Sequence, residues 1–253
     1  MIEIKNIEKS FNGTKILKGV SAVFEAGKTN LIIGQSGSGK TVMLKSLLGI
    51  HTPEAGTISF DGRIYSDLTS DEKRELRTEI GMLFQGSALF DSMTVAENVA
   101  FPLKMFTHDD KDKIQDRVDF VLKRVALVNA HHKMPSEISG GMQKRVAIAR
   151  AIVNNPKYLF CDEPNSGLDP NTATLIDNLI MEITEEYNIT TVINTHDMNS
   201  VMEIGEKIIF LKNGLKEWEG TKEDIFKTDN EGIVDFVYSS NLFKKVREAY
   251  LKG

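Results

Sequence analysis

Residues Gly34 to Thr41 read Gly-Gln-Ser-Gly-Ser-Gly-Lys-Thr and follow the apolar run Leu31-Ile32-Ile33. They match G-x-x-x-x-G-K-[ST], the pattern of a phosphate-binding P-loop. A polyphosphate needs a concave ring of backbone N–H donors, and only small residues let the backbone wrap that closely. The stretch therefore predicts a nucleoside triphosphate site, with Lys40 on the phosphates and the Thr41 hydroxyl on Mg²⁺.

The flanking sequence supplies the setting that this motif requires. A strand is predicted before the loop, and Val42 to Leu48 indicate a buried helix whose positive end points at the anion. A chance Gly/Ser-rich turn is the simpler alternative, but such a match arises in roughly one chain in a hundred at average residue frequencies. The residues predicted to hold the nucleotide are Gly34, Gln35, Ser36, Gly37, Ser38, Gly39, Lys40 and Thr41.

The composition sets limits on the class of protein. The chain has 253 residues, 41% of them hydrophobic, which is enough for one large domain or two small ones. A net charge of -5 argues against a nucleic-acid binder. A single cysteine, Cys161, fits a reducing compartment. With no secretory signal at Met1 and no apolar run of ~18 residues, we expect a cytoplasmic protein that reaches a membrane only through a partner.

The N-terminal region has the alternation of an antiparallel hairpin. The predicted strands lie between Ile2 and Phe24, with the turn at Asn12-Gly13. Phe11 precedes this turn, where an aromatic side chain either packs in the core or offers a face on which a base stacks. The local sequence favours core packing.

The middle of the chain, from about residue 90 to 155, changes to helical spacing. Apolar residues recur there three and four positions apart, at Ile114, Val118, Val121, Leu122 and Val125 and again at Met142, Val146, Ala149 and Val153. A buried strand, Tyr158 to Cys161, follows and ends in Asp162-Glu163. Two adjacent carboxylates there are costly unless a cation or a hydrogen-bonding role compensates them, and this is where a second metal-binding element of a P-loop ATPase is expected. Cys161 itself is predicted to be a small core residue.

Several polar and apolar features of the last third remain open at this level. Thr190 to Asn194 predicts a strand that ends near His196, and Thr221 with Asp224 indicates a helix cap. The tail carries apolar stripes that pack either on this chain's own core or on a neighbouring subunit. They comprise Ile233, Phe236 and Val237, then, after a possible cap at Asn241, Leu242, Phe243, Val246, Ala249 and Tyr250.

A dense apolar segment surrounds Pro102. It runs from Phe84 to Phe106 and includes Leu89, Phe90, Met93, Val95, Val99, Phe101, Leu103, Met105 and Phe106. A helical insert could bury some of these side chains internally. Their density beside Gln85 also predicts a groove that accepts an apolar helix from a partner.

The stretch Ile138-Ser139-Gly140-Gly141-Met142-Gln143-Lys144-Arg145 resembles the Ser-Gly-Gly signature of the ATP-binding cassette family. It lies between the P-loop and Cys161-Asp162-Glu163-Pro164, which Ser166-Gly167-Leu168-Asp169 follows, and this is the order of that family. The resemblance covers residues 1 to about 225. It implies an α/β fold with a RecA-like P-loop NTPase core (1–88 and 157–220), an N-terminal antiparallel β subdomain, an inserted helical subdomain (89–156) and a C-terminal helical tail (221–253).

The resemblance also implies a role for each motif residue around ATP and Mg²⁺. Phe11 would stack on adenine, and His196 would close over the γ-phosphate. Asp162 would help to bind Mg²⁺ through water, and Gln85 would contact the metal and sense the γ-phosphate. Glu163 would orient and polarise the attacking water.

The signature residues are implied to act across a dimer. Ser139, Gly140 and Gly141 would contact the ATP held by the P-loop of a second copy, with Asp169 at the same interface. The signature departs from the family's common Leu-Ser-Gly-Gly-Gln form at both ends, at Ile138 and Met142. The role of the usual glutamine is therefore in doubt.

A narrower resemblance connects Met82 to Phe90, Glu97 to Leu103 and the Ser-Gly-Gly-Met signature with the ATPase subunit of Mla-type phospholipid transporters of bacterial envelopes. It implies integral-membrane permease subunits as partners and a periplasmic lipid-binding subunit. It also implies a peripheral position on the cytoplasmic face of the inner membrane.

Three other classes of protein fit these residues less well. A cassette ATPase of DNA repair or translation tends to carry a long coiled coil or two cassettes, whereas one P-loop and a short insert are present here. A GTP-dependent switch has only Thr221-Lys222-Glu223-Asp224 in its favour, which better fits a helix start. A non-catalytic binding module does not explain Glu163 together with His196.

Overall fold

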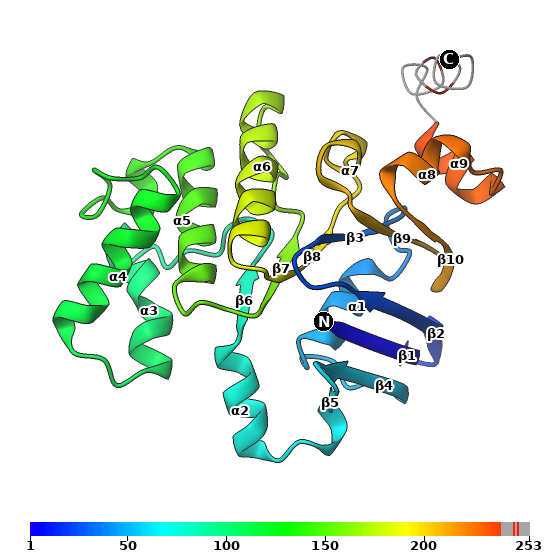
Figure 1. Ribbon diagram of the computed structural model, residues 1–253, viewed down its shortest axis with the longest axis horizontal. Helices are drawn as coiled ribbons and strands as arrows, with labels where there is room; N and C mark the ends of the chain where they lie inside the picture. Colours follow the sequence, from blue (N-terminus) through cyan, green and yellow to red (C-terminus); the bar gives the residue numbers. More distant parts are fainter. Residues whose placement is uncertain (239–244, 246, 248–253) are drawn as a thin grey trace. The chain divides into compact units, whose positions relative to one another are not determined.

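The computed structural model describes residues 1–238, 245 and 247, and the chain divides into two compact units (Figure 1). The first unit comprises Met1–Leu68 with Val192–Gly253, and the second unit comprises Thr69–Thr191. The division into a nucleotide-binding core and a helical subdomain at 89–156 remains a proposal.

An antiparallel sheet opens the first unit. Its strands are β1 (Ile2–Phe11), β2 (Thr14–Phe24), β4 (Ala55–Phe60) and β5 (Arg63–Ile64), in the order β2-β1-β4-β5, and a 3-10 turn (Tyr65–Asp67) follows. Asn12 and Gly13 have φ values of 50° and 79°, so both central positions of the turn are left-handed, as in a type I′ hairpin. The predicted hairpin is confirmed.

A mixed set of strands carries the P-loop in the first unit. Strand β3 (Thr29–Ile33) is buried throughout and runs parallel to β9 (Lys207–Lys212). Strand β10 (Leu215–Gly220) pairs antiparallel with β9. Helix α1 (Lys40–Leu47) follows the loop, as the apolar pattern predicted, and α7 (Met198–Ile204) is a helix that the pattern did not reveal.

The second unit combines parallel strands with helices. Strand β6 (Ile80–Leu83) runs parallel to β7 (Tyr158–Asp162), with Met82 opposite Phe160. Helix α2 (Ser70–Thr78) precedes β6 and α6 (Pro170–Glu186) follows β7. Strand β8 (Thr190–Asn194) spans the boundary at Thr191, where the chain returns to the first unit.

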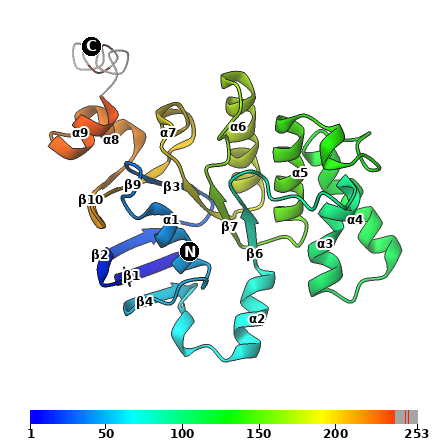
Figure 2. The same ribbon diagram turned by 180° about the vertical axis from the view of Figure 1, so that it is seen from behind.

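Three helices of the second unit pack against one another, as both views show (Figures 1 and 2). Helices α4 (Lys111–Arg124) and α5 (Gly140–Ile152) confirm the predicted helical insertion; a 3-10 turn (Pro135–Glu137) precedes α5. Helix α3 (Val95–Phe106) lies within the predicted helical stretch but was not predicted as a separate helix, and Pro102 lies inside it. The capping box of Thr94 and Glu97 was the signal that could have revealed it.

The tail helices α8 (Lys222–Lys227) and α9 (Glu231–Val237) pack on this chain's own first unit. Thr221 and Asp224 form a capping box, so this stretch is a helix start, as expected. Ile233 and Val237 are buried, and the Phe236 ring lies 5.2 Å from that of Phe210. The second predicted stripe (Leu242, Phe243, Val246, Ala249 and Tyr250, with Asn241) lies outside the described residues. In the described part of the chain, every helix is too short or too polar to span a bilayer.

Burial of α9 predicts a stability effect. Replacing Ile233 by Ala removes a fully buried side chain and should lower the free energy of unfolding by about 2–5 kcal/mol. Leu215→Ala is the matched control, because Leu215 is exposed in the same unit, and it should change stability by less than about 0.5 kcal/mol. Urea unfolding of both variants measures the difference; equal midpoints would show that α9 is dispensable for the fold.

Candidate functional site

The backbone of the P-loop requires glycine at its first position. Gly34 has a φ of 150°, and a Cβ atom there would collide with the carbonyl oxygen of Leu211 on β9. Gly39, with a φ of 107°, ends the loop as the residue before α1. The tight approach of β9 and the positive φ values explain why glycine recurs in this loop, at Gly34, Gly37 and Gly39.

Lys40 and the start of α1 supply positive charge and N–H donors. The Lys40 ammonium donates to the carbonyl oxygens of Gly34 at 2.7 Å and Gln35 at 3.2 Å, which holds the side chain over the loop. Helix α1 begins without a capping side chain and without an acidic residue in its first turn, whereas α2, α3, α5 and α6 all begin with a side-chain cap. The N–H groups at this helix start suit an anion.

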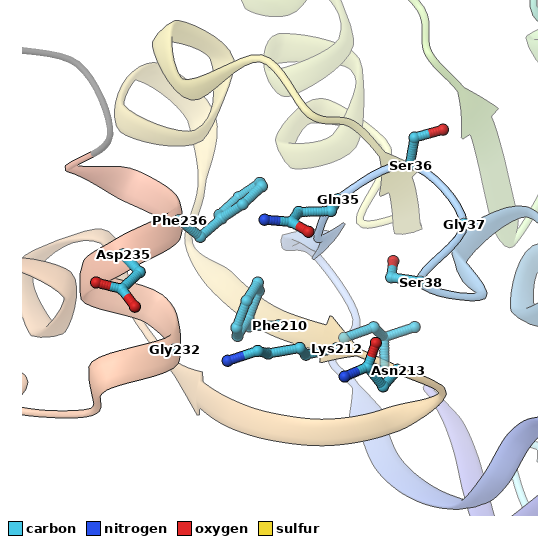
Figure 3. A pocket seen from close by; sticks show the side chains of 11 residues that line it. Gln35, Ser36, Gly37, Ser38, Phe210, Lys212, Asn213, Gly232, Asp235 and Phe236 are labelled. Atoms are coloured by element: carbon cyan, nitrogen blue, oxygen red, sulfur yellow. The ribbon is translucent and has the colours of Figure 1, made fainter.

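The rear of the P-loop borders a pocket of about 210 Å³ (Figure 3). The carbonyl oxygen of Ser38 accepts a hydrogen bond from the backbone N–H of Gly214 at 3.2 Å, which ties the loop to the β9–β10 turn. Figure 3 shows the Gln35 side chain directed toward the ring of Phe236 on α9. The tail helix thus lies beside the phosphate-binding loop of the same unit.

Phe11 does not pack in the core, so the expectation from local sequence is wrong. Its side chain is 39% exposed because it ends β1 at the hairpin turn. His51 meets the ring edge-on at 5.1 Å, and the Lys9 ammonium lies 5.2 Å from the ring centre. An exposed ring can stack on a base, so a role with adenine remains a proposal.

His196 belongs to the same unit as the P-loop. It is exposed and follows β8, directly before the residue that caps α7. The backbone N–H of Asp197 donates to the Thr195 hydroxyl at 3.0 Å, which fixes the turn that presents His196. Its contact with the γ-phosphate stays a prediction.

The second unit carries the two carboxylates at the end of β7. Asp162 and Glu163 are both half-buried. Glu163 has a φ of 50°, a left-handed conformation that is uncommon for glutamate and typical of strained functional positions. Cys161 is fully buried, and burial raises the pKa of its thiol well above the usual range, which confirms its place in the core.

The signature residues form the start of α5. The Ser139 hydroxyl caps this helix by accepting from the Met142 N–H at 3.3 Å. A Cβ atom on Gly141 would lie 2.7 Å from the Thr172 methyl group of α6, so this position tolerates only glycine without a shift. Asp169 caps α6 from an exposed position, and its hydrogen bonds from Thr172 lower its pKa.

Gln143 has a structural role that the sequence did not reveal. Its side-chain amide donates to the Pro135 carbonyl oxygen at 2.9 Å, bridging the segment that precedes the signature. Ile138, which replaces the more common leucine, is buried. Gln143 therefore braces the signature start, one position after the place where the family's glutamine usually stands.

Lys144 is a second residue that pattern reasoning missed. Its side chain is only 4% exposed, and its ammonium makes no hydrogen bond within the described part of the chain. Burial lowers the pKa of Lys144, and the nearby Glu163 carboxylate opposes that effect. The signature helix thus carries a buried cation near the proposed general base.

Gln85 lies at the second position of a tight turn after β6. The N–H of Ser87 donates to the Phe84 carbonyl oxygen at 3.0 Å, and Gly86 has a φ of 76°, as a type II turn requires. Gln85 is exposed. The second unit therefore holds Gln85, the signature, Asp162, Glu163 and Asp169, and the first unit holds Phe11, the P-loop and His196.

The donor atoms suit Mg²⁺. Thr41 offers a hydroxyl, Gln85 an amide oxygen and Asp162 a carboxylate, and Mg²⁺ prefers oxygen ligands. Magnesium at nucleotide sites is held by one or two protein groups together with phosphate oxygens. When bound, the ion would neutralise charge on the phosphates.

A P-loop, a Ser-Gly-Gly helix start and a carboxylate pair after a buried strand, in this order along the chain, define a cassette-type ATPase. Residues 17–166 match the ABC transporter family, and the chain belongs to it. It is 38% identical over 236 residues to the probable ribonucleotide transport ATP-binding protein mkl of Mycobacterium leprae, covering 93% of this chain and 68% of that one. It is 42% identical over 254 residues to the methionine import protein MetN of Carboxydothermus hydrogenoformans, covering 99% and 75%.

Solved structures of ABC ATPases have the same fold as this chain. The dimeric cassette MJ0796, in a post-hydrolysis state with ADP and Pi, matches with a TM-score of 0.79 and 35% identity over 88% of this chain and 99% of that one. The cbiO1 protein of Clostridium perfringens, part of the cbiONQ transporter complex, matches with a TM-score of 0.84 and 29% identity over 98% of both chains. The chain has the ABC ATPase fold, binds ATP with Mg²⁺ and is an ATPase.

Glu163→Gln should leave ATP binding intact and slow hydrolysis by roughly 10²- to 10⁴-fold, the contribution typical of a general base. Lys40→Ala is the contrasting variant, since it removes a charge from the phosphates and should weaken nucleotide binding itself. Binding of a fluorescent ATP analogue and phosphate release separate the two effects. Turnover near wild type in the Glu163 variant would exclude it as the base.

Proposed function

We propose that two copies of this chain form the pair of ATPase subunits of a membrane transporter whose cargo is phospholipid. The observation that carries the transporter assignment is an exposed apolar groove in the second unit, beside the Gln85 turn. An apolar surface of this kind in an ATPase subunit fits a helix supplied by a permease.

The groove has a volume of about 390 Å³ and uses only part of the apolar segment. Val95, Val99 and Leu103 are buried in the packing of α3, so these side chains serve the helical core. The residues that line the groove come from the end of α2, β6, the following turn and one face of α3, together with the end of α5 and the segment after it. They are Arg77, Ile80, Gly81, Met82, Phe84, Ala88, Phe90, Phe101, Pro102, Met105, Phe106, Arg150, Ala151 and Asn154.

A second copy would complete the ATP site. Ser139, Gly140 and Asp169 are exposed at two adjacent helix starts in the second unit, where Gly141 of α5 and Thr172 of α6 approach so closely that a Cβ atom on Gly141 would not fit without a shift. This surface offers N–H groups and a hydroxyl to a nucleotide bound elsewhere. The dimeric form of the similar MJ0796 cassette supports this arrangement.

The cargo is the finer part of the proposal. Met82 to Phe90, Glu97 to Leu103 and the Ser-Gly-Gly-Met signature favour phospholipid, a periplasmic lipid-binding subunit and a position on the cytoplasmic face of the inner membrane. The curated relatives, named for ribonucleotide transport and methionine import, favour a small polar cargo as the second candidate. Either cargo is chosen by the membrane partner, because an ATPase subunit acts through its permease.

Purification of the chain with its native membrane partner tests the cargo. Mass spectrometry of the bound small molecules should show phospholipid enriched over the surrounding membrane. The same preparation without this chain is the control for lipid held by detergent. Methionine or a nucleotide bound stoichiometrically to the permease, with no lipid enrichment, would replace the phospholipid proposal.

Charge placed in the groove should uncouple the subunit from its permease. Phe90→Glu and Met105→Glu add a carboxylate to an exposed apolar lining and should abolish permease-stimulated hydrolysis and transport, while ATP binding by the isolated subunit persists. Leu89→Glu, next to the groove, should act in the same way.

Phe120→Glu is the matched control. Phe120 is an equally exposed aromatic residue of α4 that does not line the groove, so this variant should couple normally. Normal transport by the Phe90 and Met105 variants would place the docking surface elsewhere.

A further inference from the structure

Arg150, near the end of α5, donates hydrogen bonds to the backbone of the turn that follows Gln85. Its Nη2 donates to the carbonyl oxygen of Ser87 at 2.7 Å and its Nη1 to that of Ala88 at 2.8 Å. The guanidinium also lies 5.9 Å from the ring centre of Phe90. The side chain is 9% exposed, so these contacts are made largely out of water.

The conformation that Arg150 holds is unfavourable by itself. Gly86, Ser87 and Ala88 have consecutive φ values of 76°, 68° and 46°, and two of these residues carry a Cβ atom. Non-glycine residues in this region cost free energy and persist only where their surroundings fix them. Two charge-assisted hydrogen bonds to adjacent carbonyl groups supply that fixation.

A second polar side chain holds the far end of the same segment. The Asn98 side chain accepts from the Phe90 N–H at 2.8 Å and donates to the Phe90 carbonyl oxygen at 3.1 Å. Asn98 is fully buried on α3. With β6 before it, Gln85 therefore lies in a segment fixed on both sides, and Arg150 is the attachment nearest to it.

Arg150 shares a helix with the signature. Ser139 caps the first turn of α5, and Arg150 lies in its last turns, so a displacement of the signature end carries the guanidinium with it. We infer that Arg150 is a positioning residue that holds the Gln85 turn and transmits movement of the signature end of α5 to it. This inference rests on the proposed roles of Gln85 and of the signature.

Substitution of Arg150 should slow hydrolysis without loss of nucleotide affinity. Arg150→Lys keeps the charge but cannot make the forked pair of hydrogen bonds, and kcat of the isolated full chain should fall about 10-fold, as expected for a lost charged hydrogen bond. The Kd for ATP should stay within about twofold, because Arg150 is not in the unit that holds the P-loop. Arg150→Met should reduce kcat further.

Arg117 of α4 provides the matched control. It donates to the carbonyl oxygens of Ile152 and Val153 at the end of α5, at 3.1 and 2.8 Å, and makes no described contact with the turn. Arg117→Lys should lower the melting temperature as much as Arg150→Lys and leave kcat unchanged at 25 °C. Equal effects of both variants on kcat, or none of Arg150→Lys, would overturn the inference.

A double-mutant cycle with Gln85→Ala tests the route. If Arg150 acts through Gln85, Arg150→Lys should cost less than twofold in kcat when Gln85 is already alanine. If the effects of the two substitutions on kcat are fully additive, or if Gln85→Ala has a normal kcat, the inference that Arg150 acts through Gln85 is overturned. All of these assays use the subunit without a permease. Failure of the transporter proposal would appear only in permease-stimulated hydrolysis, so it can be distinguished from failure of the inference on Arg150. Circular dichroism identifies any variant that does not fold. If Arg150→Met does not fold, the kcat of Arg150→Lys decides whether the inference holds.

Discussion

The N–H groups at the start of α1 determine how the first unit is built. They have no acceptor within the helix, and no side chain caps them. An anion can use them only if the preceding loop wraps closely, which requires Gly34 against Leu211 of β9. The fully buried β3 fixes the beginning of that loop, and the Gly214–Ser38 hydrogen bond fixes its rear. Strand, loop, helix and β9–β10 turn thus serve one electrostatic requirement.

Sequence reasoning succeeded where chemistry is local. The P-loop, the hairpin turn at Asn12-Gly13 and the Thr221 cap depend on neighbouring residues, so their spacing was sufficient. It was less successful where packing decides the structure. The exposure of Phe11 depends on where β1 ends, and the position of Pro102 inside a helix depends on the packing of α3. No local pattern marks Arg150 as the partner of Ser87 and Ala88, which lie 63 and 62 residues earlier.

Helix α5 concentrates polar groups that a helix chosen for stability alone would not contain. Lys144 and Arg150 are both buried, and burying a cation costs free energy unless partners compensate it. Arg150 is compensated by two carbonyl groups, whereas Lys144 has the field of Glu163. The helix that begins at the signature thereby reaches both the proposed base and the Gln85 turn. Costs of this kind are expected at functional positions.

Backbone strain, like the buried cations of α5, is found in the second unit. In the described part of the first unit, left-handed residues are Gly, Asn or Asp, which tolerate that conformation. In the second unit, Ser87, Ala88 and Glu163 adopt it at the Gln85 turn and at the end of β7, and Ala126 adopts it after α4. The phosphate loop is therefore built from residues that tolerate its conformation, while the turns at Gln85 and Glu163 are held by their surroundings. A turn held from outside changes when its support moves, and for Ser87 and Ala88 that support is the guanidinium of Arg150.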